Sequence, residues 1–281
     1  MPELPEIEVM RRDLEKEIVG RRIKDVEVRP GTNAMKIIKR HGRRKELQDL
    51  LTGAKVDRIE RVGRRLLLHF DNGNVALISL GPSGQLKKVS ASEAVEAHTH
   101  IVFSFTIGGQ LRLTDPARKA DVFVTSAEHV EEMPELRDFM IDPLESPVTW
   151  NDFSILLSQR EATLREVLTD DHFVVGLGDI YTDEVLWASG LRHDKMSNKL
   201  SSQDVRRLYR GLMETLQEAV KAQGMSIGAG DFSDLQGNPG QFQLELKVYD
   251  RAGEACRRCR STIVKQKAGG RFTYFCAQCQ S

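Results

Sequence analysis

The apolar positions at the start of the chain recur at the spacing of an α-helix. They are Leu4, Ile7, Met10, Leu14 and Ile18. Charged residues separate them, so one face of the segment is apolar and the other is polar. We therefore predict a helix over residues 3–18 whose apolar stripe docks on a sheet.

Residues 22–125 show the alternation and the short apolar runs that are typical of β-strands. The predicted strands are Ile23–Val28, Arg65–Phe70, Asn74–Leu80, Ile101–Ile107 and Gln110–Leu113. Two tight turns, Asp71–Gly73 and Gly108–Gly109, would close two hairpins. A basic helical stretch over residues 32–52 interrupts the strands. Short strands at this spacing indicate an N-terminal antiparallel β-sandwich with the first helix at its flank.

The second half of the chain is helical, with polar connections. Residues 128–150 are acidic and contain three prolines, so we predict a linker that can include a short helix. Asp152–Gln159 and Ala162–Leu168 are short amphipathic stretches, and Ser201–Asp204 has the residues of a helix N-cap. The apolar stripe behind this cap comprises Val205, Leu208, Leu212, Leu216 and Val220. Residues 224–244 are rich in glycine and polar groups, and a loop of this length is either functional or disordered.

These patterns predict an α+β protein with four segments. They are an N-terminal domain (1–127), a linker (128–150), a helical domain (151–244) and a cysteine-rich appendage (245–281). The 281 residues suffice for two modest domains, and the apolar 40% can fill a core. No apolar run reaches the roughly 18–20 residues that a membrane helix needs, and the N-terminus is not a signal peptide. We therefore expect a soluble, cytoplasmic, nucleoid-associated protein without membrane contact.

The net charge of the chain is zero, but its distribution is uneven. Residues 36–65 carry a net charge of +7 and residues 251–281 carry +6, whereas residues 128–145 carry −6. Two basic segments suggest a basic surface of limited extent that can bind a polyanion. The alternative is that these runs are only solvated faces.

All four cysteines lie in the last 26 residues, with the spacing C-x2-C-x16-C-x2-C. They are Cys256, Cys259, Cys276 and Cys279. Each CxxC turn directs two thiolates at one point, and four thiolates suit tetrahedral Zn²⁺. Disulfides are disfavoured in a chain without an export signal. We predict one structural Zn²⁺ per chain, which stabilises a small β-hairpin.

The N-terminal sequence MPELPEIE carries the candidate chemistry. Removal of Met1 would leave Pro2 with a secondary amine, and an α-amino group titrates near ~7.7–8.0, so part of it is neutral near neutral pH. Such an amine can attack a sugar C1′ or an aldehyde, whereas a retained Met1 would make Pro2 an unreactive amide. Glu3 and Glu6 can act as general acid or base, or can orient the sugar. The alternative is structural, since Pro and Glu are ordinary residues of a first helical turn.

Gly176 and Gly178 mark a tight turn directly before the start of a helix. A turn of this kind presents free backbone N–H groups and is a natural phosphate site. A plain hairpin of two helices is the alternative at this point.

Three separated motifs carry a resemblance to a known family. MPELPEIE, VVGLGDIYTDEVLW and GRFTYFCAQCQ resemble segments of the formamidopyrimidine-DNA glycosylase and endonuclease VIII family, and the resemblance covers nearly the whole chain. It implies a β-sandwich, a helical domain with a helix–two-turn–helix motif, a zinc finger and a DNA cleft. In the family a damaged base is flipped out and excised, and the abasic sugar is then cleaved through an imine with the N-terminal proline.

The resemblance also implies roles for individual residues. Pro2 would be the nucleophile, Glu3 the essential acid or base, and Glu6 a support of the site. Arg64 stands where the family usually has a catalytic lysine. The residues expected to contact DNA are Arg165, Gly178, Asp179, Tyr181, Arg271, Pro82 and Arg118.

Several positions depart from the family pattern. The His and Met of the family's HLGMSG are Ser79 and Pro82 here, and the Arg and Phe of its DPRRFG are Ala117 and Lys119. In the family, three of these four positions, here Pro82, Ala117 and Lys119, carry the side chains that fill the space left by a flipped base, so all three of those side chains are replaced. The usual Asn of GLGNIY is Asp179, which would bring a negative charge toward phosphate.

We therefore expect a divergent, monomeric DNA repair enzyme that excises an oxidised or otherwise damaged base and cleaves abasic sites. The lesion-recognition loop at residues 224–240 lacks the family's GG(S/T)T run. The replaced residues favour abasic sites, single strands, bubbles or bulky lesions over 8-oxoguanine in a paired duplex. A non-catalytic or lyase-only DNA-binding paralogue is the alternative, and a zinc-ribbon protein adaptor is a third possibility.

Overall fold

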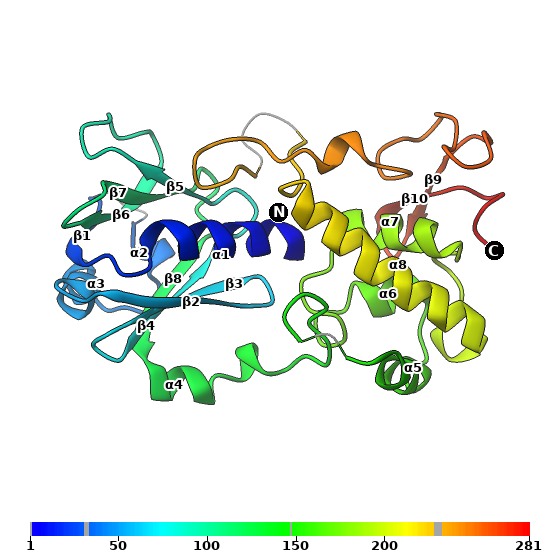
Figure 1. The fold of residues 1–281 in the computed structure, drawn as a ribbon, viewed down its shortest axis with the longest axis horizontal. Helices are drawn as coiled ribbons and strands as arrows, with labels where there is room; N and C mark the ends of the chain where they lie inside the picture. Colours follow the sequence, from blue (N-terminus) through cyan, green and yellow to red (C-terminus); the bar gives the residue numbers. More distant parts are fainter. Residues whose placement is uncertain (1, 31–33, 147, 228–231) are drawn as a thin grey trace. The chain divides into compact units, whose positions relative to one another are not determined.

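The computed structural model describes residues 2–30, 34–146, 148–227 and 232–281 (Figure 1). The chain forms two compact units, each of which contains two separate stretches of sequence. The first unit comprises residues 1–137 and 223–241, and the second unit comprises residues 138–222 and 242–281. Each unit has a hydrophobic cluster of its own.

Two antiparallel four-stranded sheets form most of the first unit. One has the order β1-β6-β7-β5, with β1 at Ile23–Val28, β6 at Thr99–Phe105, β7 at Gln110–Thr114 and β5 at Gln85–Val89. The other has the order β2-β3-β4-β8, with β2 at Val56–Val62, β3 at Arg65–Phe70, β4 at Asn74–Ser79 and β8 at Asp121–Ser126. Both predicted hairpins are confirmed, because β3 pairs with β4 and β6 pairs with β7.

Helix α1, at Leu4–Ile18, carries the predicted apolar stripe, and all five stripe residues are buried. The helix contacts β2 and β3, so its apolar face covers the second sheet. The described part of the basic stretch forms two short helices, α2 at Ala34–Ile37 and α3 at Arg44–Leu51.

The first part of the acidic segment after β8 packs into the first unit. It contains α4 at Ala127–Glu132 and a 3-10 turn, η1, at Pro134–Leu136. Its apolar residues Val130, Met133 and Leu136 are buried against side chains of β3 and β4. The short helix that the prediction allowed for in the linker 128–150 is present, and the boundary between the two units falls after Arg137. The acidic residues of 128–135 face solvent, while three apolar residues fill the core.

The second unit is built from helices, as the sequence predicts. They are α5 at Trp150–Ser158, α6 at Leu164–Leu168, α7 at Asp179–Ser189 and α8 at Ser202–Lys221, with 3-10 turns η2 at Ser197–Lys199 and η3 at Phe242–Leu244. The Ser201 hydroxyl caps α8 by accepting the N–H of Asp204 at 3.2 Å, and the predicted stripe of α8 is buried. Gly211 allows α8 to approach α7 closely, since a Cβ there would lie 2.5 Å from Oγ of Ser189.

The cysteine-rich end forms an antiparallel hairpin of β9, at Val264–Ala268, and β10, at Arg271–Phe275. Trp187 of α7 packs into a cluster with Ile263, Tyr274 and two of the cysteines. This contact fixes the hairpin to the helices of the second unit.

Residues 223–241 belong to the first unit, whereas the sequence reasoning placed them in the helical domain. The N–H of Leu235 donates to the Asp13 carboxylate at 3.3 Å, and its carbonyl accepts the N–H of Lys88 at 2.8 Å. These hydrogen bonds attach the segment to α1 and β5. Residues 228–231 of the predicted loop lie outside the described residues.

Among the described residues, no helix is both long and apolar enough to span a membrane.

Candidate active site, phosphate pocket and metal centre

A hydrogen-bonded cap holds the N-terminal residues of the first unit. Glu3 is the N-cap of α1, directly behind the buried Pro2. One carboxylate oxygen of Glu6 accepts the N–H of Glu3 at 2.8 Å, and the other accepts the N–H of Met225 at 2.9 Å. Glu3 is 5% exposed and Glu6 is 3% exposed. Since both oxygens of Glu6 hold backbone groups, this residue orients the chain that carries Pro2.

Gly224 closes this arrangement from the other side. Its φ of +74° lies in the left-handed region, which favours glycine. A Cβ at this position would lie 3.0 Å from the Glu6 side chain. Backbone conformation and space therefore both require glycine here. Sequence reasoning found only a glycine-rich loop and missed this contact.

A buried ion pair lies beneath the same helix. The Arg61 side chain is 0% exposed, and its Nε donates to Glu8 at 3.0 Å. Burial alone would raise the pKa of Glu8, but hydrogen bonds from Arg11, Arg12 and Arg61 hold it below its ordinary value. Arg61 also donates to the carbonyl of Gly63 at 3.1 Å.

The ion pair of Glu8 and Arg61 was not predicted, but it helps to position Arg64, which was predicted as a site residue. Arg61 fixes the turn between β2 and β3, and the half-buried Arg64 stands in that turn beside Gly63. The position expected for a catalytic cation is thus anchored to α1 through Glu8.

Two loops of the first unit carry the positions that, on the resemblance, would fill the space of a flipped base. Asp115 is fully buried and accepts hydrogen bonds from the Ser83 hydroxyl and from the N–H groups of Ala117, Lys119 and Ala120. This carboxylate joins the loop after β4 to the loop after β7. The tip residues Pro82, Ala117, Arg118 and Lys119 are exposed. The loops therefore have a rigid base, while their tips lack the usual side chains.

A pocket of about 500 Å³ in the second unit gathers residues that were assigned to phosphate. Gly178 is the N-cap of α7, and Gly176 has a φ of +78° in the preceding turn. The charged side chains that line the pocket are Arg165, Lys267, Arg271, Glu166, Asp179 and Asp194. Equal numbers of basic and acidic groups make the pocket electrically balanced.

Arg165 makes internal contacts in this pocket and is only 6% exposed. Its guanidinium donates to Asp183 at 2.9 Å, to Asp179 at 2.8 Å and to the carbonyl of Phe272 at 3.0 Å. Burial raises the pKa of Asp183 to about 7, although the hydroxyl of Thr273 and the charge of Arg165 oppose the shift. Arg165 therefore joins α7 to β10, and its contact with phosphate stays a prediction.

Tyr181 lies in the core of the second unit. Its side chain is fully buried, and its ring centroid lies 5.3 Å from that of Phe242. A contact of Tyr181 with DNA stays a prediction. Arg271, by contrast, is exposed on β10.

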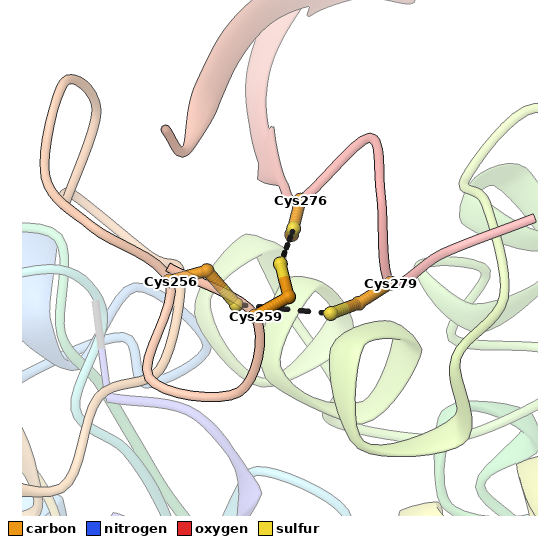
Figure 2. Close-up of side chains that lie close together, drawn as sticks. All are labelled: Cys256, Cys259, Cys276 and Cys279. Atoms are coloured by element: carbon orange, nitrogen blue, oxygen red, sulfur yellow. Dashed lines mark hydrogen bonds between the residues drawn. The ribbon is translucent and has the colours of Figure 1, made fainter. Parts of the chain in front are cut away.

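The four cysteines converge from two turns at the ends of the hairpin (Figure 2). Their sulfur atoms all lie within 4.8 Å of one another. The Sγ atoms of Cys256 and Cys279 are 3.9 Å apart, and those of Cys259 and Cys276 are 3.4 Å apart. Zn–S bonds of ~2.3 Å in a tetrahedron require sulfurs roughly 3.8 Å apart, so the cluster fits Zn²⁺. Four protein ligands close the site, and the metal is structural.

The chain was compared with known families. Residues 1–122 match the formamidopyrimidine-DNA glycosylase N-terminal domain, and residues 140–230 match the formamidopyrimidine-DNA glycosylase H2TH domain. Residues 253–281 match the zinc finger found in FPG and IleRS. The three matches coincide with the sandwich, the helices and the cysteine hairpin.

Individual relatives agree with these matches. The formamidopyrimidine-DNA glycosylase of Bacillus licheniformis is 36% identical over 281 residues, which are 100% of this chain and 99% of that protein. That of Heliobacterium modesticaldum is 35% identical and is covered fully in both chains. The structure of Lactococcus lactis Fpg with DNA containing an abasic site superimposes with a TM-score of 0.87, at 30% identity and 99% coverage of both chains. The chain therefore belongs to the formamidopyrimidine-DNA glycosylase family, whose members are bifunctional DNA glycosylases and abasic-site lyases.

Proposed function

We propose that this chain excises damaged bases and cleaves abasic sites through an N-terminal Pro2 amine. The observation that carries the proposal is the cap behind Pro2, in which both oxygens of Glu6 hold backbone N–H groups. The N-terminus is thereby oriented by a buried carboxylate. An ordinary first helical turn would not need Glu6 to bind Met225, which lies 219 residues away in sequence.

The chemistry follows from a neutral secondary amine. The Pro2 nitrogen attacks C1′ of the sugar and the C1′–base bond breaks, so that the base leaves with the electron pair and takes up a proton. The Pro2 nitrogen then loses its proton, and the C1′–O4′ bond opens as O4′ takes up a proton, which leaves an iminium ion. The iminium acidifies the C2′ proton, and loss of this proton expels the 3′ phosphate. Glu3 is the proposed acid or base for these transfers, Glu6 orients the chain, and Arg64 supplies a cation.

We further propose that the substrate range is shifted away from 8-oxoguanine in a paired duplex. The tips of both loops are exposed and carry Pro82, Ala117 and Lys119 in place of the usual space-filling residues. Flipping a base costs a few kcal/mol, and it costs least where the base is unpaired or absent. Abasic sites, bubbles and single strands are therefore the preferred substrates. The Lactococcus lactis relatives were crystallised with abasic-site DNA and with DNA that contains an oxidised pyrimidine.

Borohydride trapping on abasic-site DNA tests the chemistry, with the N-terminus of the protein checked by mass spectrometry. Reduction converts the imine into a stable covalent adduct. We expect an adduct that disappears in Pro2→Gly and persists in Arg271→Ala at high protein concentration. No adduct from a correctly processed N-terminus would favour the alternative, a DNA-binding paralogue without catalysis, which the presence of Asp179 supports.

A parallel assay tests the substrate range. Excision is compared on 8-oxoguanine paired with cytosine, on the same lesion in a bubble, on the single strand and on an abasic duplex. We expect the paired 8-oxoguanine to be the poorest substrate. Efficient excision from the paired duplex that depends on the opposite base would contradict the proposed shift while leaving the Pro2 chemistry intact.

A further inference from the structure

Asp179 lies between two guanidinium groups in the phosphate pocket of the second unit. Its Oδ1 accepts a hydrogen bond from Arg165 at 2.8 Å and lies 3.5 Å from Nη1 of Arg271. The Asp179 side chain lines the pocket and is 30% exposed, so it is accessible to solvent. One carboxylate oxygen thus occupies a place between two cations that a phosphate oxygen would also favour.

We propose that Asp179 is a built-in anion that neutralises Arg165 and Arg271 and thereby lowers the affinity of this pocket for DNA phosphate. This inference rests on the proposed function, because it requires that the pocket receives the DNA backbone. It adds an internal competitor, in which Asp179 and the incoming phosphate compete for the same cations.

Arg165 cannot readily turn toward DNA to escape this competition. The same guanidinium donates to Asp183, which is 1% exposed, and to the carbonyl of Phe272. A rotation of Arg165 would leave the buried carboxylate of Asp183 without its cation, which is unfavourable. Arg165 is therefore a positioning residue.

Arg271 is the cation that can change partner. Its side chain is 68% exposed, and its separation of 3.5 Å from Asp179 is that of a loose surface ion pair. The second exposed cation of the pocket is Lys267, whereas Glu166 and Asp194 add further negative charge. With this balance of charges, removal of one carboxylate leaves the charged groups of the pocket with a net positive charge.

A purely structural role for Asp179 predicts a different result. Asp179 is the first residue of α7, where a negative charge stabilises the positive end of the helix. On that basis alone, Asp179→Asn would lower the melting temperature slightly and would leave DNA affinity unchanged or reduced. The salt dependence of binding separates the two roles, because it reports the number of phosphates that are neutralised.

The test uses the full-length, zinc-loaded protein and a labelled duplex with a tetrahydrofuran analogue of an abasic site. Binding is measured by fluorescence anisotropy over a series of KCl concentrations. We expect Asp179→Asn to bind about tenfold more tightly at low salt, with a slope of log K against log salt that is steeper by ~0.9, the value for one additional phosphate contact. The control is Glu218→Gln, which removes the same charge from an exposed position of α8. It should change affinity less than twofold.

Arg271→Ala separates failure of this inference from failure of the proposed function. If Arg271→Ala leaves affinity and salt slope unchanged, the pocket does not receive phosphate and the proposed DNA contact is wrong. If Arg271→Ala weakens binding but Asp179→Asn does not strengthen it, the competition is wrong and the DNA contact stands. In the double variant, the gain from Asp179→Asn should fall below twofold, because Arg271 is the cation that the substitution releases.

Discussion

The substitution Glu8→Gln tests the buried ion pair of the first unit. The Arg61 side chain is 0% exposed, and its Nε lies 3.0 Å from Glu8. In the variant this guanidinium stays buried and loses the carboxylate that its Nε contacts, and breaking a buried ion pair from one side costs about 3–5 kcal/mol. The glutamine oxygen and the carbonyl of Gly63 can still accept hydrogen bonds from Arg61. We therefore expect the lower end of this range, about 3 kcal/mol of unfolding free energy.

Urea unfolding of the zinc-loaded protein measures this loss with two probes. The two tryptophans of the chain, Trp150 and Trp187, both lie in the second unit, so their fluorescence reports on that unit. Far-UV circular dichroism also reports on the sheets of the first unit. With a denaturant slope of about 2 kcal/mol per M, the first-unit midpoint should fall by about 1.5 M. The fluorescence transition should not move.

Two further variants make the test specific. Glu15→Gln is the matched control on the same helix, since Glu15 pairs with Arg11 at 2.8 Å but its side chain is 56% exposed. Such an exposed pair contributes at most about 1 kcal/mol. Addition of Arg61→Met to Glu8→Gln should recover stability, because no buried charge remains. The reasoning is refuted if Glu8→Gln loses no more than Glu15→Gln, or if the added Arg61→Met deepens the loss.

Three more predictions concern pH, a glycine and the metal. Because folding lowers the pKa of Glu8, its ionised carboxylate contributes fully to the unfolding free energy above its ordinary pKa of 4.5, and this contribution is lost as the pH falls through the lowered pKa. The unfolding free energy of the wild type should therefore approach that of Glu8→Gln in acid. A difference between the two that stays constant with pH would contradict this. Gly224→Ala should cost about 1–3 kcal/mol and reduce the trapped adduct, whereas Gly237→Ala, with a similar positive φ but open space, should leave the adduct unchanged. Removal of zinc by a chelator should expose Trp187, shift its emission to the red and abolish DNA binding, and added zinc should reverse all three; retained binding without zinc would show that the hairpin does not need the metal.

Local patterns in the sequence were sufficient to predict many of the helices and strands. The apolar stripe from Leu4 to Ile18 and the turn at Asp71–Gly73 correspond to α1 and to the β3–β4 hairpin. The strand β5 was not predicted, because Leu86 is its only buried residue and two lysines follow it. The strand β2 was missed for a related reason, since its pairing with β3 is irregular and breaks the alternation of buried positions. Periodicity predicts an element only where one face of that element is continuously buried.

The site was predictable in its residue types and less so in its contacts. The cysteine spacing identified the metal centre because all four ligands come from two short turns. The pair of Glu8 and Arg61 joins residues 53 positions apart, and each alone has the composition of a surface residue. Asp179 was expected to repel phosphate, and only the structure places it against Arg165 and Arg271.

The discontinuity of the first unit has a consequence for the newly made protein. Residues 223–241 complete that unit, and they leave the ribosome after α5, α6, α7 and α8 of the second unit. At synthesis rates of about 5–20 residues per second, Met225 is made many seconds after Glu6, so the hydrogen bond between its N–H and Glu6 cannot form before then. We therefore expect the N-terminal residues to gain this support only after Met225 has left the ribosome. A polypeptide interrupted before Met225 would carry Pro2 without the backbone contact that fixes Glu6.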